Sequence, residues 1–149
     1  MRKPTGKAES IHTVSDGKRV LALIYKNVRA PKGARFLTPI SYPLQVGLHE
    51  YTKKRTAPLH QHPDFKYPVN TTQEFIYVEK GTVTATITNK RWKIIETHVL
   101  KRGDFILTID GGHAYTFSRG SRVIEVKQGP YPGDAKAKIY YAESAKNSG

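Results

Sequence analysis

The chain has 149 residues and a mass of 16.8 kDa, which is the size of a single domain. It contains no cysteine, and this excludes disulfide scaffolds, cysteine-based zinc sites and cysteine nucleophiles. Because the sequence has no run of about 18 apolar residues, we expect no transmembrane helix. The polar first residues lack the apolar stretch of a secretory signal, so the sequence predicts a cytoplasmic protein.

The net charge of +13 is unevenly distributed: residues 1–60 hold 12 basic and only 3 acidic residues. Such an excess is typical of proteins that bind nucleic acid, an anionic membrane surface or an anionic small molecule. The basic residues occur in short groups such as Lys53-Lys54-Arg55, without the aromatic interleaving that favours a nucleic-acid face. We therefore expect a small anionic or sugar-like ligand, no membrane partner, and nucleic acid only as the less favoured alternative.

Short alternating segments separated by Gly, Asp and Ser predict strands along most of the chain. In residues 82–88, Val83, Ala85 and Ile87 share one face and four threonines occupy the other. No segment shows a convincing amphipathic helical period. The pattern predicts one all-β domain, an antiparallel sandwich or barrel over about residues 18–130 with loose ends at 1–10 and 142–149. The expected strands are 20–25, 44–51, 75–78, 82–88, 92–95, 105–109, 113–117 and 123–126.

The strongest chemical feature is His60-Gln61-His62. On an extended segment these two imidazoles project from the same face, about 6–7 Å apart along the strand. Two histidines placed in this way can converge on one metal ion. The alternative is a pair of surface or packing histidines with no ligand role.

Glu74 and His113 add two further candidate ligands. Glu74 shares a strand face with the apolar Ile76 and Val78, where a carboxylate is costly unless it is paired or bound to a metal. His113 opens a strand on the face that also carries Tyr115. A core histidine satisfied by a backbone carbonyl is the alternative for His113. A purely structural role in the core is a weaker explanation when three histidines and one glutamate all point inward.

At these residues the chain resembles the cupin family, small β-barrels built from two motifs. The first motif contains a His-x-His pair, then a glutamate followed by six residues and a glycine, and His60-Gln61-His62, Glu74 and Gly81 fit this order. The second motif runs from a glycine to a histidine, and Gly103 and His113 fit its ends. The resemblance covers roughly residues 44–127 and implies a cupin-type jelly-roll barrel of the kind associated with polysaccharide and sugar-nucleotide genes.

The chain departs from the cupin pattern at four points, one of which is the spacing from Gly103 to His113, which is one residue short. Eleven residues separate His62 from Glu74, where the family has three or four. Ile109 stands where proline is usual, and Phe117 stands where asparagine is frequent. With these departures, the resemblance implies one divalent metal ion held by His60, His62, Glu74 and His113. Histidine and carboxylate ligands suit Fe, Ni, Mn, Co, Zn or Cu, so the identity of the metal stays open.

Other polar residues on two strands can line a pocket beside the metal. Gln45, His49 and Tyr51 share one strand face, and Glu125 and Lys127 share another. We assign substrate binding to Gln45, Tyr51, Tyr115 and Lys127, and the role of a catalytic base to His49 or Glu125. In the opposite orientation these side chains face solvent, and Val46, Leu48, Ile124 and Val126 face the core.

The resemblance implies a metal-dependent enzyme acting on a sugar, a nucleotide sugar or another oxygen-rich small molecule, by isomerisation, epimerisation or dioxygen chemistry. One alternative is a non-catalytic module that binds a sugar or small acid, and another is a basic nucleic-acid-associated protein. A metal-free nucleotide-sugar epimerase is a further reading, but such enzymes rely on a histidine–aspartate pair and a tyrosine. We also expect a homodimer, formed when residues 20–25 add to a neighbouring sheet edge.

Overall fold

The structure is a computed structural model that describes residues 10–29 and 33–142. Nearly all of its regular structure is strand, which confirms the expected all-β fold with little helix. The one short helix among the described residues is α1 (Asp134–Ala137). The strands are β1 (Ser10–Asp16), β2 (Arg19–Lys26), β3 (Gly33–Phe36), β4 (Gly47–Glu50), β5 (Glu74–Lys80), β6 (Thr82–Thr88), β7 (Ile94–Lys101), β8 (Phe105–Thr108), β9 (Gly112–Phe117) and β10 (Arg122–Lys127).

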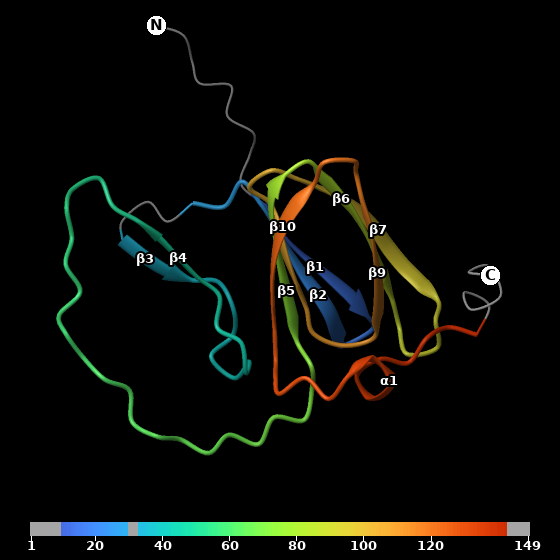
Figure 1. The fold of residues 1–149 in the computed structure, drawn as a ribbon. Coiled ribbons are helices and arrows are strands. Elements are labelled where there is room, and N and C mark those ends of the chain that lie inside the picture. Colours follow the sequence, from blue (N-terminus) through green and yellow to red (C-terminus); the bar gives the residue numbers. More distant parts are fainter. Residues whose placement is uncertain (1–9, 30–32, 143–149) are drawn as a thin grey trace, which may run out of the picture.

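The strands form a five-stranded sheet, a three-stranded sheet and a separate hairpin (Figure 1). The five-stranded sheet has the order β1-β2-β8-β5-β10, the three-stranded sheet has the order β7-β6-β9, and every pair is antiparallel. The two sheets pack face to face, with β1 lying against β7. Within the described residues no ladder joins the two sheets, so they form a sandwich whose edge strands β9 and β10 have no hydrogen-bonded neighbour on their outer side.

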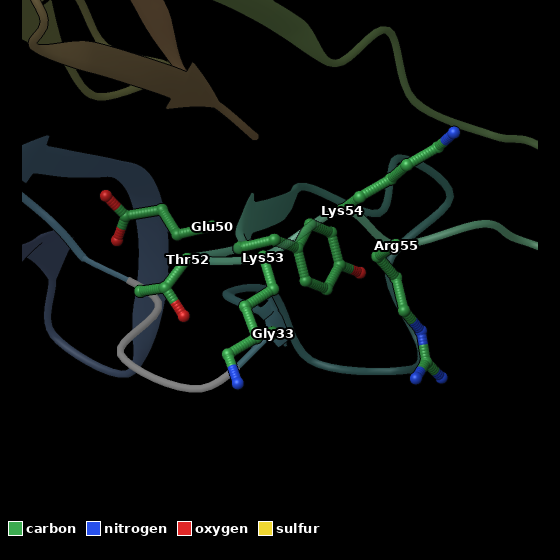
Figure 2. Close-up of a pocket in the computed structure, with 7 residues that line it drawn as sticks. Gly33, Glu50, Thr52, Lys53, Lys54 and Arg55 are labelled. Carbon is green, nitrogen blue, oxygen red and sulfur yellow. The ribbon is translucent and has the colours of Figure 1, made fainter.

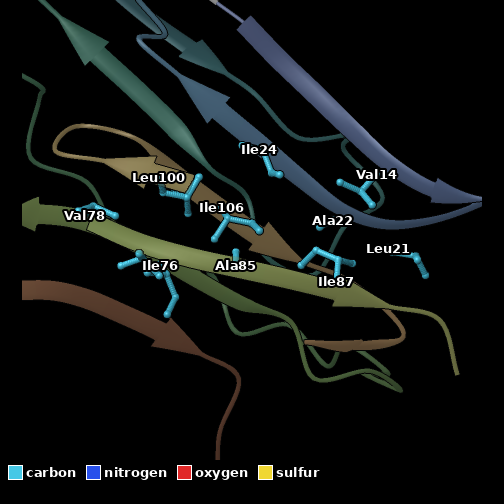
Figure 3. Packing of buried hydrophobic residues seen from close by; sticks show 11 residues of the cluster. Val14, Leu21, Ala22, Ile24, Ile76, Val78, Ala85, Ile87, Leu100 and Ile106 are labelled. Carbon is cyan, nitrogen blue, oxygen red and sulfur yellow. The ribbon is translucent and has the colours of Figure 1, made fainter. Parts of the chain in front are cut away.

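The core between the sheets follows the predicted alternation. Val83, Ala85 and Ile87 on β6 are fully buried, and the threonines between them are half-buried on the other face. They pack against residues of the facing sheet such as Ile76 and Ile106 (Figure 3). Burying these side chains removes apolar surface from water, which stabilises the sandwich by about 25 cal/mol for each Å². The full cluster is Val14, Leu21, Ala22, Ile24, Ile76, Val78, Val83, Ala85, Ile87, Leu100 and Ile106.

The outer face of the five-stranded sheet carries a second core. Tyr25 on β2 is fully buried there, its ring stacks on Phe105 with centroids 4.7 Å apart, and its hydroxyl donates to the Leu37 carbonyl at 3.1 Å. Burial raises the pKa of Tyr25 to about 12. Val46, in the connection between β3 and β4, and Leu48, on β4, pack against this second core.

Strand β2 lies inside the sheet rather than at its edge. It pairs with β1 on one side and with β8 on the other. Both rows of backbone groups are therefore used within the chain. The prediction that residues 20–25 add to the sheet of a neighbouring molecule is wrong, although the predicted homodimer itself stays a prediction.

The hairpin lies beside the sandwich, where Leu48 of β4 packs against the second core, and the segment that follows the hairpin loops away from the sandwich (Figure 1). β3 and β4 pair with each other, and the chain then runs through residues 51–73 without forming a strand. Almost all of this segment is exposed, including the apolar side chains of Leu59, Phe65 and Tyr67. Its first residues, among them Lys53 and Arg55, surround a shallow hollow at the end of the hairpin (Figure 2).

Several strands differ from the sequence-based expectation: β3 was not predicted, and β4 covers only residues 47–50 of the expected strand 44–51. β1 was not predicted, because Val14 is its single fully buried side chain. β7 begins at Ile94 rather than at Trp92, since the Asn89 side chain accepts backbone hydrogen bonds from Arg91 and Lys93 and holds a turn there.

The chain ends fall largely beyond what the structure describes. The expected loose ends at 1–10 and 142–149 lie outside the described residues, apart from Ser10 at the start of β1 and Ala142 in a turn. No helix among the described residues is long and apolar enough to cross a membrane.

Candidate functional site

Polar side chains gather on the inner faces of the sheets where β5 lies opposite β9. Glu74, at the start of β5, continues the inner face of Ile76, and its side chain is 14% exposed. His113 also points inward, since it pairs in register with the buried Ile87. Its Nε2 atom lies 3.2 Å from Oε1 of Glu74. The structure thus brings together two of the four predicted metal ligands and confirms that both face inward.

The interaction with His113 sets the charge state of Glu74. The hydrogen bond from His113 lowers the pKa of Glu74, and the positive charge of Lys127 adds to this effect. Burial alone would act in the opposite direction. Glu74 is therefore a carboxylate at neutral pH, and it fixes the orientation of the His113 imidazole.

Tyr115 lies beside His113 on the inner face of β9. The two rings are tilted, with centroids 4.9 Å apart. The Tyr115 hydroxyl is buried next to Thr108 and makes no hydrogen bond of standard geometry with the described residues. Burial raises the pKa of Tyr115 above its usual range, so the phenol keeps its proton. We call Glu74, His113 and Tyr115 the open-edge cluster, because they lie toward the unpaired edges of β9 and β10.

A glycine fixes the entry of the chain into β9. Gly111 has a φ of 74°, a left-handed conformation that favours glycine. A Cβ at this position would collide with the carbonyl oxygen of Thr88. The sharp turn expected before His113 is therefore present, and it sets His113 at the start of the inner face.

Glu125 and Lys127 on β10 face the same side as the open-edge cluster. In register, Lys127 lies opposite Glu74, and Glu125 lies opposite the buried Ile76. Lys127 Nζ is 2.9 Å from Glu125 Oε1 and 5.1 Å from the centre of the Tyr131 ring. The hydrogen bond that Lys127 donates to the Glu125 carboxylate raises the pKa of Lys127, which is a cation at neutral pH. Glu125 and Lys127 share the face of Val123, which packs against the core, but both are exposed, and their roles in catalysis and binding stay predictions.

A shared pocket requires Gln45, His49 and Tyr51 to point inward, but the structure directs them outward. Val46 and Leu48 pack against the second core, so alternation directs the other three side chains to solvent. His49 Nδ1 lies 3.2 Å from the Tyr51 hydroxyl. The Gln45 amide donates to the carbonyls of its own loop, at Pro39 and Tyr42. The structure gives these three residues no contact with the open-edge cluster, and the pocket expected on this strand is a wrong prediction.

A basic hollow of about 310 Å³ lies at the end of the hairpin (Figure 2). Tyr51, Glu50 and three consecutive basic side chains line it. Tyr51, one of the predicted substrate-binding residues, lies there beside three consecutive basic side chains. The lining residues are Gly33, Glu50, Tyr51, Thr52, Lys53, Lys54 and Arg55.

His60 and His62 lie on the exposed segment after the hairpin. Their rings are 5.2 Å apart at an angle of 77°, and His60 Nδ1 lies 2.7 Å from the Pro58 carbonyl oxygen. The two histidines are close to each other, as predicted from the His-x-His spacing. The structure does not bring His60 and His62 to Glu74 and His113. The four-ligand metal site stays a prediction, and its four residues here form two separate pairs.

A different group of possible metal ligands occurs at the opposite seam of the sandwich. His12 on β1 and Glu96 and His98 on β7 place one ligand atom each within 4.8 Å of one another, the one such group of three found in the described residues. We call these three residues the seam cluster. The local sequence pattern did not indicate these three residues. His12 nevertheless shares a strand face with the buried Val14, and His98 shares one with the buried Leu100. This signal was missed because β1 was not predicted and β7 was placed too early.

No family model, curated protein or solved structure matches this chain.

Proposed function

We propose that the protein is a small enzyme of the isomerase or epimerase type, which moves a proton on a sugar, a nucleotide sugar or another oxygen-rich molecule. The observation that carries this proposal is the open-edge cluster. It combines a histidine oriented by a carboxylate with a neighbouring tyrosine that keeps its proton. A pair of this kind provides a base and an acid within one site.

In the proposed reaction His113 is the base. Its Nε2–H faces Glu74, which leaves Nδ1 as the unprotonated nitrogen. Nδ1 takes a proton from a carbon next to a carbonyl group, and the C–H electron pair moves to form an enolate. The Tyr115 hydroxyl hydrogen-bonds the enolate oxygen as negative charge develops. When the carbon that loses the proton carries a hydroxyl group, that hydroxyl gives its proton to the enolate oxygen and becomes the new carbonyl, and protonated His113 returns its proton to the former carbonyl carbon, which gives an isomer. When water instead protonates the original carbon on its opposite face and His113 releases its proton to the resulting hydroxide, the product is an epimer.

The surroundings of the cluster support an oxygen-rich and anionic substrate. The buried Tyr115 hydroxyl has an unused hydrogen-bonding capacity that a ligand oxygen would satisfy. Lys127 places a positive charge opposite Glu74 on the same face. The overall charge of +13 would further attract a phosphate or carboxylate group.

We further propose a cupin-type jelly roll, in which the exposed segment after the hairpin joins the sandwich. Two features support this: β9 and β10 have free edges, and residues 51–73 contain exposed apolar side chains but no strand. Pairing of this segment with β9 would bring His60 and His62 toward His113. This arrangement is the basis of a second candidate function, a metal-dependent cupin enzyme, but the described geometry does not assemble its four ligands and the proton transfer above uses no metal.

Hydrogen exchange with solvent tests the proposed function. The protein is incubated in D₂O with a panel of keto sugars and nucleotide-linked keto sugars, and deuterium incorporation is followed by mass spectrometry. We expect exchange next to the carbonyl in at least one compound and a loss of about 10²–10⁴-fold in the His113→Gln variant. Thr116→Val, on the outer face of the same strand, is the matched control and should exchange at the parent rate.

The panel also separates the alternatives. Exchange that disappears with a chelator and in a His60→Gln/His62→Gln double variant would support the metal-dependent enzyme. Saturable binding without exchange would support the non-catalytic sugar-binding or acid-binding module. The proposed function would be wrong if no compound exchanges, or if His113→Gln exchanges as fast as the parent.

A further inference from the structure

We infer that the seam cluster is a site for a divalent metal ion, separate from the open-edge cluster, and that the ion ties β1 of one sheet to β7 of the other. Both imidazoles direct Nε2 at the same carboxylate oxygen. The distances to Glu96 Oε2 are 2.7 Å from His12 and 2.6 Å from His98. Two nitrogen ligands and one oxygen ligand therefore converge on one point.

The backbone holds these three side chains on the inner face of the sandwich. Glu96 and His98 lie two residues apart on β7 and pair in register with the buried Ile87 and Ala85. His12 reaches them from the other sheet, and its ring lies 5.0 Å from the His98 ring. The site therefore lies at the edge of the apolar core, where the side chains of His98 and Glu96 are 20% and 33% exposed.

The ligand set and the spacing suit a borderline divalent ion such as Zn²⁺. Histidine nitrogen and glutamate oxygen bind Zn²⁺ at about 2.0–2.2 Å, which separates neighbouring ligand atoms by about 3.3 Å in a tetrahedral site. The N–O distances of 2.6 and 2.7 Å need to open by about 0.6–0.7 Å for the ion to enter. Three protein ligands leave one position for water, and the 47% exposure of His12 gives the ion a path from solvent.

The ion would act as a clamp because its ligands come from both sheets. His12 and Glu96 are 84 residues apart in the sequence. A metal that binds only the folded arrangement stabilises it through linkage. For a chain of this length we expect Tm to rise by about 5–10 °C when free Zn²⁺ is about 100 times its Kd.

The test uses the full-length, untagged chain with the His60→Gln/His62→Gln changes, so that the exposed histidine pair does not bind metal. Zn²⁺ binding is measured by calorimetry, Co²⁺ binding by visible absorption, and Tm with and without Zn²⁺. We expect one Zn²⁺ per chain. Adding Glu96→Gln or His98→Gln should lower the affinity by at least about 100-fold and remove the Tm shift, since even loss of a supporting hydrogen bond costs about 10–100-fold.

Thr97→Val is the matched control, because Thr97 lies between the two β7 ligands and points to the other face, where it contacts Thr86. This variant should bind Zn²⁺ like its parent. Circular dichroism checks that each variant is folded, and His12→Gln gives an independent change on the opposite strand. The inference is overturned if the parent shows no saturable binding, or if folded Glu96→Gln, His98→Gln and His12→Gln proteins all bind Zn²⁺ as the parent does.

Discussion

The two sides of the sandwich place similar residues in different surroundings. At the seam, β1 and β7 are in contact, and one glutamate oxygen receives two imidazoles at 2.6 and 2.7 Å. At the open edge, Glu74 meets one imidazole at 3.2 Å, and the nearby Tyr115 hydroxyl makes no hydrogen bond of standard geometry with the described residues.

The seam cluster joins two strands. The open-edge cluster instead leaves hydrogen-bonding capacity unused. Buried polar groups in folded proteins are normally satisfied, so an unsatisfied one in such a place is expected to have a functional reason. The seam cluster is suited to stability and metal binding, and the open-edge cluster is suited to chemistry.

Ile87 lies between the two clusters and gives the largest expected effect on stability. It pairs in register with Glu96 on β7 and with His113 on β9, and it is fully buried. Ile87→Ala should lower the free energy of unfolding by about 2–5 kcal/mol, because it opens a cavity. Urea denaturation measures the loss, and Ile87→Val should cost only about 0.5–1.5 kcal/mol. If folded Ile87→Ala protein impaired one cluster and left the other intact, the shared support between them would be refuted.

The next effect is on catalysis at the open edge. Glu74→Gln removes the charge that orients His113, and it should slow deuterium exchange by about 10²-fold, which corresponds to about 2.7 kcal/mol of transition-state stabilisation. Glu79→Gln is the control on the same strand, since Glu79 faces outward and pairs with Arg122 at 2.7 Å. Equal exchange rates for the two variants would remove Glu74 from the site.

A smaller difference is expected when one histidine is removed from each cluster in the presence of a chelator. His98→Gln breaks a short bond to a carboxylate and should lower the free energy of unfolding by about 1–2 kcal/mol after allowance for solvent screening. His113→Gln breaks a longer contact at a more exposed position and should cost less than about 1 kcal/mol. The assignment of stability to the seam fails if His113→Gln proves the more damaging change in urea denaturation.

The smallest expected effect on stability belongs to Tyr115→Phe. Its hydroxyl is buried and makes no hydrogen bond of standard geometry with the part of the chain that the structure describes, so removing it should change the free energy of unfolding by less than about 0.5 kcal/mol or stabilise the fold slightly. The same variant should lower deuterium exchange by about tenfold or more, because a donor to the enolate oxygen is lost. A clear loss of stability with unchanged exchange would mean that the hydroxyl is structural.

Local alternation made much of the fold predictable. The period of two in residues 82–88 identified the buried face of β6, and the same reasoning placed Glu74 and His113 on inner faces. For Gln45, His49 and Tyr51 the rule could not decide, because apolar residues alternate with polar ones and either face could be the buried one. The second core settled the choice by taking Val46 and Leu48.

The sequence by itself determined the all-β class, most strand positions and the inward direction of Glu74 and His113, because these depend on which residues alternate within one strand. Only the tertiary structure decided which strands meet. His12 and Glu96 come together because β1 and β7 are the edges of two sheets that pack face to face, and no local pattern encodes that contact. For the same reason the spacing of His60 and His62 revealed that they lie close to each other, whereas their distance from Glu74 depends on the path of a long segment outside the sheets.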